Sequence, residues 1–209
     1  MTTPETVATR YATSSAPSAT LDWVVLPWSF VPAIKALLPW LCTAGQRAPL
    51  GGIQIEAHED CTFLTATDGT AAITLEGPIL LGQPESASAP VLGRAVLSRE
   101  GIQAWLDACP HDAMEWSRWY TTPIALEPEQ DNYPDVRKVV PTGLLHDGIS
   151  ASSVALSSAL LSRVGVVLRK LSLTAGAGIP LIVQHTTPLS PVLLTGDINS
   201  KKNILTGVM

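Results

Sequence analysis

Residues 64–69 read LTATDG, in which apolar and polar side chains alternate up to an Asp-Gly pair. Alternation with a period of two is typical of a half-buried strand, and Asp-Gly is a strong hairpin signal because glycine accepts a positive φ. We therefore predict a strand over residues 61–67, a two-residue turn at Asp68 and Gly69, and a return strand over residues 70–76. Residues 53–58 alternate in the same way and predict the strand that precedes this hairpin.

Two helices are predicted from apolar spacing and from the residues that precede them. Ser29 can cap a helix whose apolar positions run from Phe30 to Leu41, and Pro39 should bend or shorten its far end. This helix follows a predicted strand over residues 21–27. Ser98 can cap a second amphipathic helix, which follows a predicted strand over residues 94–97.

These elements form a repeated unit of one strand, one helix and three strands. The first copy covers residues 21–76, and the second continues after its helix with strands over 114–120 and 122–126. A looser third copy has a helix over 152–171 and strands over 179–185, 192–195 and 204–208. One helix for each group of strands predicts an α+β fold, with antiparallel sheets and helices packed on one side.

Composition limits the class of protein. The 209 residues are 46% hydrophobic and 15% charged, which argues against general disorder. The net charge of -5 argues against a strongly basic nucleic-acid binder, unless the basic residues gather on one face. Residues 1–20 are rich in Thr, Ser, Ala and Pro and lack the apolar stretch of a signal peptide, so we expect a disordered leader. No apolar run is long enough to span a membrane, and we expect a cytoplasmic protein.

The cysteines do not predict a metal site or a disulfide framework. Cys42, Cys61 and Cys109 are widely separated, and their number is odd. We expect reduced, buried thiols of a cytosolic protein, and neither a cofactor nor a bound metal.

The residues give little support to an enzymatic function. The pairs His111-Asp112 and His146-Asp147 would suit a metal-dependent hydrolase, but both lie in predicted loops rather than on helices around a metal. The chain lacks a Gly-x-Ser-x-Gly elbow and a glycine-rich phosphate loop. We therefore expect no catalytic residue and keep the hydrolase as the weakest alternative.

Three aromatic side chains on a predicted strand leave two explanations open. Trp116, Trp119 and Tyr120 could stack on single-stranded nucleic acid, or they could pack within the fold.

Four stretches, taken in their order, resemble the bacterial DNA polymerase III beta subunit, the sliding clamp. They are LP at 26–27 before an amphipathic helix, ATDG at 66–69, VLSREGI at 96–102 and YPDVRKVVP at 133–141. The family usually continues the hairpin with His-Arg-Leu-Ala, whereas this chain has TAAI at 70–73. The resemblance implies a clamp-like domain over 21–134 and a shortened second clamp-like domain over 135–209.

Membership of this family would imply a non-catalytic processivity factor that encircles or tethers to DNA as a homo-oligomer. In clamps, basic residues of the helices touch the phosphates of double-stranded DNA loosely and without sequence preference. The residues of this chain that would do so are Lys35, Arg99, Arg163, Arg169 and Lys170.

The resemblance also implies a cleft that binds peptides of DNA polymerase and of other clamp partners. By position in the motifs, its residues would be Thr67, Gly69, Pro134, Lys138 and Val139, with Val208 and Met209 near its edge. The small residues after the hairpin replace the bulky and basic groups that the family has there, which implies either a different peptide specificity or a weak cleft. The alternative to a clamp is a clamp-derived interaction module that binds clamp partners without forming a ring.

Overall fold

The computed structural model describes residues 7–21, 24, 26, 30–42, 48–77, 79–80, 92–109, 128–129, 133–139, 158–175, 181–184, 193–199 and 203–208. The predicted strands over 114–120 and 122–126 lie outside these residues, and so does most of the strand predicted over 21–27. Within the described part, no helix is long and apolar enough to cross a membrane.

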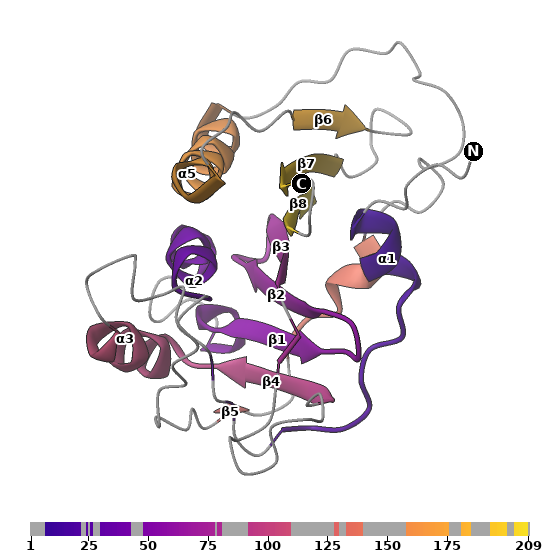
Figure 1. The fold of residues 1–209 in the computed structure, drawn as a ribbon, viewed down its shortest axis with the longest axis vertical. Helices are drawn as coiled ribbons and strands as arrows, with labels where there is room; N and C mark the ends of the chain where they lie inside the picture. The colour runs from indigo at the N-terminus through magenta and orange to yellow at the C-terminus, as the bar shows by residue number, and fades with distance from the viewer. Residues whose placement is uncertain are drawn as a thin grey trace.

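A single antiparallel sheet runs through the described structure (Figure 1). Its eight strands lie in the order β5-β4-β1-β2-β3-β8-β7-β6. Their bounds are β1 Ile53–Ala57, β2 Thr62–Thr67, β3 Ala72–Gly77, β4 Gly93–Leu97, β5 Pro128–Glu129, β6 Leu181–Gln184, β7 Leu193–Asn199 and β8 Asn203–Val208. β8 joins β3 in the register Ala72↔Val208, so the last three strands extend the sheet of the first five.

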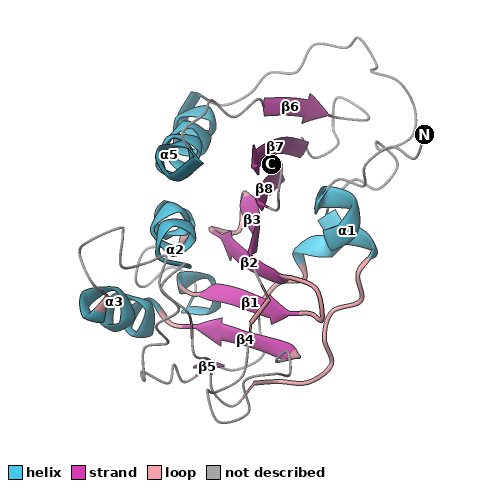
Figure 2. Cartoon of the chain, viewed as in Figure 1, coloured by secondary structure: helices cyan, strands magenta, loops and turns pink. Residues whose placement is uncertain are grey.

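Helices lie on both faces of this sheet (Figure 2). Their bounds are α1 Val7–Thr13, α2 Val31–Leu37, α3 Arg99–Ala108 and α5 Ser158–Ala175, with short 3-10 turns η2 Leu38–Trp40, η3 Ala48–Gly51 and η5 Val136–Val139. α2, α3 and α5 cover one face, as predicted, whereas α1 lies on the other. The α+β, antiparallel class is therefore confirmed, but the helices are not confined to one side.

Local sequence accounts for the ends of the two helices predicted first. The Gly101 N–H donates to Ser98 Oγ at 3.0 Å, so Ser98 caps α3 as predicted. α2 ends at Leu37 and tightens into η2, which contains Pro39. Proline at this point removes a helical N–H and its ring crowds the preceding turn, so the shortening at Pro39 is confirmed.

Two apolar clusters pack against the two faces of the sheet. The larger cluster joins side chains of β1–β4 to those of α2, α3 and α5, and it includes the fully buried Trp40 and Trp105. The smaller cluster consists of Tyr11, Cys61, Phe63, Ala72 and Val136 on the opposite face. As a result, β1 and β2 are buried along their whole length.

The hairpin lies where LTATDG predicted it, but its loop is longer. β2 ends at Thr67 and β3 begins at Ala72, so residues 68–71 form a four-residue loop instead of a two-residue turn. Asp68 Oδ1 accepts hydrogen bonds from Thr70 N at 2.9 Å, Thr70 Oγ1 at 2.7 Å and Ala71 N at 3.0 Å. These side-chain bonds organise a wider turn than the strand alternation indicates.

The prediction of a disordered leader over residues 1–20 is wrong for the part that the structure describes. Val7–Thr13 form α1, and Tyr11 is fully buried. Farther along, Leu21 N donates to Arg94 O and Arg94 N donates to Ala19 O, both at 2.8 Å, beside β4. A Cβ on Gly93 would lie 2.5 Å from Leu21 Cδ2, so this close passage needs glycine there. The division at residue 134 stays a prediction.

Glycine substitutions should have opposite effects at two positions of the fold. Gly69 has φ 87, which favours glycine, so Gly69→Ala should lower the free energy of unfolding by about 1 kcal/mol. Gly165 lies exposed in α5, where an added Cβ meets nothing within 4 Å, so Gly165→Ala should raise it by up to about 1 kcal/mol. Urea unfolding followed by circular dichroism checks both signs. Equal effects of the two substitutions would contradict the described turn.

Candidate functional site

The five basic residues predicted to face DNA divide into two groups. Lys35 on α2 and Lys170 on α5 lie together, because Lys170 Nζ donates to the Lys35 carbonyl at 2.9 Å. Arg169, next to Lys170 in α5, is exposed, as is Lys35. We call these three residues the basic helix face. They are on two adjacent helices of the face that α1 does not cover (Figure 1).

Arg163 has a different environment from the basic helix face. Its guanidinium donates to Asp68 Oδ2 at 2.5 Å and to the Pro39 carbonyl at 3.3 Å, and it stacks 4.4 Å from the centre of the Trp40 ring. Burial alone would raise the pKa of Asp68, but hydrogen bonds from Thr70, Arg163 and Ala71 outweigh it and lower this pKa to about 2. Arg163 therefore joins α5 to η2 and to the hairpin.

Arg99, the fifth predicted cation, also makes contacts inside the protein. Its Nη2 lies 3.5 Å from the Leu41 carbonyl and 3.4 Å from the Cys42 carbonyl. Arg99 thus links the first turn of α3 to the residues that follow η2.

Of the residues predicted to bind partner peptides, Thr67, Gly69 and Val208 lie around the start of β3. Thr67 pairs with Ala72, and Ala72 pairs on its other side with Val208, so the three occupy one row across β2, β3 and β8. Thr67 is buried and Gly69 is exposed. Thr67 Oγ1 donates to the Ala71 carbonyl at 2.8 Å and accepts from Gly69 N at 3.0 Å, so its hydroxyl is used within the turn.

The segment that begins with Tyr133 and Pro134 is attached to β2. Tyr133 donates its hydroxyl to the Thr65 carbonyl at 3.0 Å, and the next residue, Pro134, is exposed. Lys138 lies in η5 with 80% of its side chain exposed, 3.6 Å from Asp135. Val139 ends η5, and Met209 lies outside the described residues. The structure thus brings Thr67 and Val208 together and anchors the residue before Pro134 on β2.

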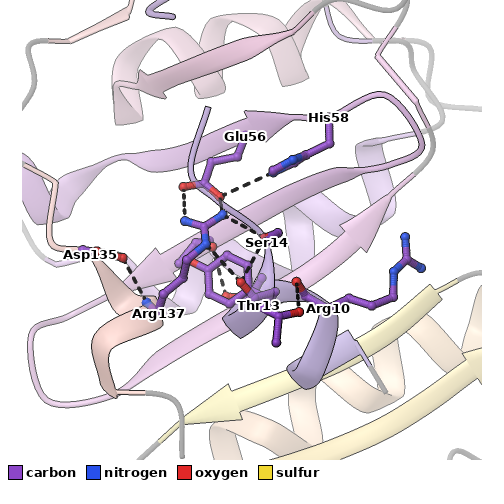
Figure 3. Close-up of polar contacts among 10 residues, drawn as sticks. Arg10, Thr13, Ser14, Glu56, His58, Asp135 and Arg137 are labelled. Atoms are coloured by element: carbon purple, nitrogen blue, oxygen red, sulfur yellow. Dashed lines mark hydrogen bonds and ion pairs between the residues drawn. The ribbon is translucent and has the colours of Figure 1, made fainter. Parts of the chain in front are cut away.

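A buried ion pair on the α1 side of the sheet was not predicted. Arg137 of η5 donates to both carboxylate oxygens of Glu56, at 2.7 Å for Oε1, and its Nε donates to the Tyr11 carbonyl at 3.0 Å (Figure 3). His58 Nε2 lies 4.0 Å from Glu56 Oε2. The Glu56 side chain is only 2% exposed. Burial acts to raise the pKa of Glu56, but the nearby His58 and the hydrogen bonds and charge of Arg137 outweigh it and lower this pKa.

A second pair lies beside it on the same face. Arg10 of α1 donates to Glu76 Oε1 and to Asp60 Oδ2, both at 2.8 Å.

Arg137 belongs to the YPDVRKVVP stretch, and Glu56 to an alternating strand, but neither pattern indicates a partner. The sequence shows two acidic residues on strands and two arginines elsewhere, and this does not indicate which arginine pairs with which acid.

Among the described residues, no group of three His, Cys, Asp or Glu side chains could hold a metal ion. Burial raises the pKa of Cys61 to about 12 and that of Cys109 to about 11, which keeps both thiols protonated and unreactive. The hydrolase candidates His111, Asp112, His146 and Asp147 lie outside the described residues, as do Trp116, Trp119 and Tyr120.

Comparison with known proteins gives a match in structure alone. No family model matches the sequence, and no curated protein matches it. The beta clamp of Helicobacter pylori in complex with diflunisal superposes on 94% of this chain with a TM-score of 0.60 and 10% sequence identity. The chain has the beta-clamp fold. An identity this low shows the fold and nothing further.

A second clamp structure agrees with the first. The H. pylori beta clamp bound to a DNA ligase peptide matches 90% of this chain, with a TM-score of 0.56 and 12% identity. The match covers 66% of the first clamp chain and 64% of the second. This beta-clamp fold therefore spans about two thirds of the length of the clamps it matches, whose family is not enzymatic.

Removing the Glu56 carboxylate should change how stability depends on pH. The pKa of Glu56 is below its ordinary value of 4.5, so its stabilising effect is complete above about pH 4.5 and is lost as the pH falls through the folded-state pKa. We expect Glu56→Gln to lower the free energy of unfolding by about 3 kcal/mol at pH 7 and by clearly less at pH 3. Urea titrations between pH 3 and pH 7 measure this.

The exposed Glu59, in the turn between β1 and β2, provides the control. Glu59→Gln should change stability by less than about 0.5 kcal/mol across the same range. A loss for Glu56→Gln that is as large at pH 3 as at pH 7 would mean that its ionisation does not matter.

Proposed function

We propose that this protein is a sliding-clamp-like accessory factor of a DNA polymerase, which tethers to double-stranded DNA and binds partner peptides. The observation that carries the proposal is the beta-clamp fold over 94% of the chain. A further support is that the sheet brings Thr67 and Val208 into one row beside the anchored Tyr133-Pro134 segment. The proposed domain division at residue 134 would place this region at a domain junction.

The basic helix face supports the DNA-binding half of the proposal. Lys35, Arg169 and Lys170 lie on α2 and α5, the helical side that would line a ring. Loose contacts between such cations and phosphates hold DNA without reading its sequence, and they weaken as salt rises. Arg99 and Arg163 already contact carbonyl oxygens and, for Arg163, a carboxylate. Lys35 and Arg169 are exposed whereas Arg99 and Arg163 are half-buried, so we assign the larger share of DNA contact to the basic helix face.

The DNA-binding half predicts a variant that loses retention on DNA. Lys35→Ala/Arg169→Ala/Lys170→Ala should weaken retention on a closed circular plasmid and reduce the salt slope of log K by about 2–3, since each phosphate contact contributes about 0.9. Retention on circular and on linearised plasmid at several salt concentrations measures both quantities. The control Lys138→Ala removes an exposed cation outside this face and should leave retention unchanged. Equal losses in both variants would indicate nonspecific charge effects.

The peptide-binding half predicts the reverse result for the same two variants. The DNA ligase peptide that the H. pylori clamp binds is a suitable probe, labelled with fluorescein. Lys138→Ala should weaken its binding about 3- to 10-fold, because an exposed cation near the proposed contact contributes on the order of 1 kcal/mol. The triple variant of the basic helix face should bind the peptide as the wild-type chain does. No peptide binding by any of these proteins would argue against this half alone.

A second candidate function is a clamp-derived interaction module that does not encircle DNA. The observation favouring it is that Arg99 and Arg163 make contacts within the protein. Measurement of mass in solution separates the two functions. A closed homo-oligomer supports the clamp, and a monomer that persists at micromolar concentration together with intact peptide binding supports the module.

A further inference from the structure

α1 covers the face of the sheet that α2, α3 and α5 leave open (Figures 1 and 2). It contacts β8 and η5, which are the elements that carry Val208 and Lys138. We call the residues under it the α1 surface; they are Glu56, Asp60, Phe63, Glu76 and Arg137. α1 is the first described element of the chain, whereas β8 is the last.

Two adjacent side chains fasten α1 to the α1 surface. Tyr11 is fully buried, with its ring edge-on to Phe63 at a centroid distance of 5.1 Å and the Arg137 guanidinium 4.3 Å from its centre. Arg10 reaches two carboxylates, those of Glu76 and Asp60 (Figure 3 shows Arg10 and the Arg137 cluster). An aromatic ring in an apolar site next to a paired arginine is the arrangement of a binding hot spot.

The charges of the α1 surface complement those of α1. The Glu76 side chain is 5% exposed, and a carboxylate so buried requires a cation or several donors. Arg137 pairs with Glu56 from within the surface, whereas the cation on Glu76 is supplied by α1. The surface therefore combines a buried acid, an exposed acid and an aromatic ring, which suits a peptide with an arginine followed by an aromatic residue.

α1 depends on this contact for its own structure. It has seven residues, fewer than an isolated helix needs to be stable in water. Residues 15–18 after it are neither helix nor strand, and the chain is held again where residues 19–21 exchange hydrogen bonds with Arg94. α1 is thus a short ligand on a tether, and tethering gives it an effective concentration in the millimolar range.

We propose that the α1 surface is a peptide-binding site that α1 occupies in cis, and that a partner's helical segment with an arginine followed by an aromatic residue occupies it in trans. Binding of the partner's segment requires α1 to leave the α1 surface, which uncovers η5 and β8 at the same time. Peptide binding at the α1 surface does not depend on tethering to DNA, so either of these two proposed activities can be contradicted without the other.

A labelled copy of α1 tests the site directly. The probe is a fluorescein-labelled synthetic peptide of residues 5–16, ETVATRYATSSA, titrated with full-length protein by fluorescence anisotropy. Arg10→Ala/Tyr11→Ala frees the α1 surface and should bind the probe at least 10-fold more tightly than the wild-type chain does. Thr13→Ala, at an exposed position of α1, is the matched control and should behave as wild type. A probe with both anchor residues replaced by alanine should bind to none of the proteins.

A third substitution identifies the chemistry of the contact. Adding Glu76→Gln to the double variant should weaken probe binding about 10-fold, because the arginine of the probe then meets a neutral group. If the double variant is folded by circular dichroism but binds the probe no better than wild type, the proposal is overturned. Dimers of the wild-type chain that form with concentration and disappear in the double variant would assign the surface to a second copy, which also overturns it.

Hydrogen exchange on the wild-type chain covers the case in which the double variant does not fold. Amides of α1 should exchange through local opening, faster than those of β2, and excess unlabelled probe should speed exchange in α1 while leaving β2 unchanged. Exchange of α1 at the rate of β2, with no response to the probe, would overturn the proposal.

Discussion

The antiparallel pairing of β3 with β8 connects the two ends of the sheet. Among the strands that the structure describes, this pair alone links the first five to the last three. Its register, from Ala72↔Val208 to Leu75↔Leu205, places the end of β8 beside the hairpin after β2. The pairing also brings α5 next to α2, where Arg163 bonds to Asp68 and stacks on Trp40. Both candidate sites, the row of Thr67 and Val208 and the basic helix face, depend on this one strand contact.

The second face of the sheet shows how a polar strand surface becomes buried. Gln54, Glu56 and Thr65 are on the strands opposite to the main core, yet all are buried. A buried carboxylate is tolerated when a bidentate guanidinium pairs with it, and Arg137 does so for Glu56. α1 and η5 exclude water from this pair, and the low dielectric constant that results strengthens it. The clamp-like fold therefore has helical segments on both faces, each with its own set of charges.

Local sequence was sufficient where neighbouring residues supply the physical cause. Ser98 caps α3 because its own side chain reaches Gly101 N, and Pro39 ends α2 by its own covalent geometry. The hairpin could be placed for the same reason, since Gly69 has the positive φ expected of it. The length of its loop could not, because it depends on where the Asp68 carboxylate finds donors.

The sequence by itself determined the α+β class, the order of the described α-helices and strands from α2 onward apart from β5, and the resemblance to clamps, because period-two and helical spacing, caps and turns act within a few residues. The tertiary structure alone decided that Glu56 is buried, that Arg163 turns to Trp40 and that residues 7–13 form a docked helix. Those outcomes depend on contacts between residues such as Tyr11, Phe63 and Arg137, which lie far apart in the chain. An arginine or a tyrosine carries no local mark of the partner it will meet, and only the assembled sheet brings those partners within reach.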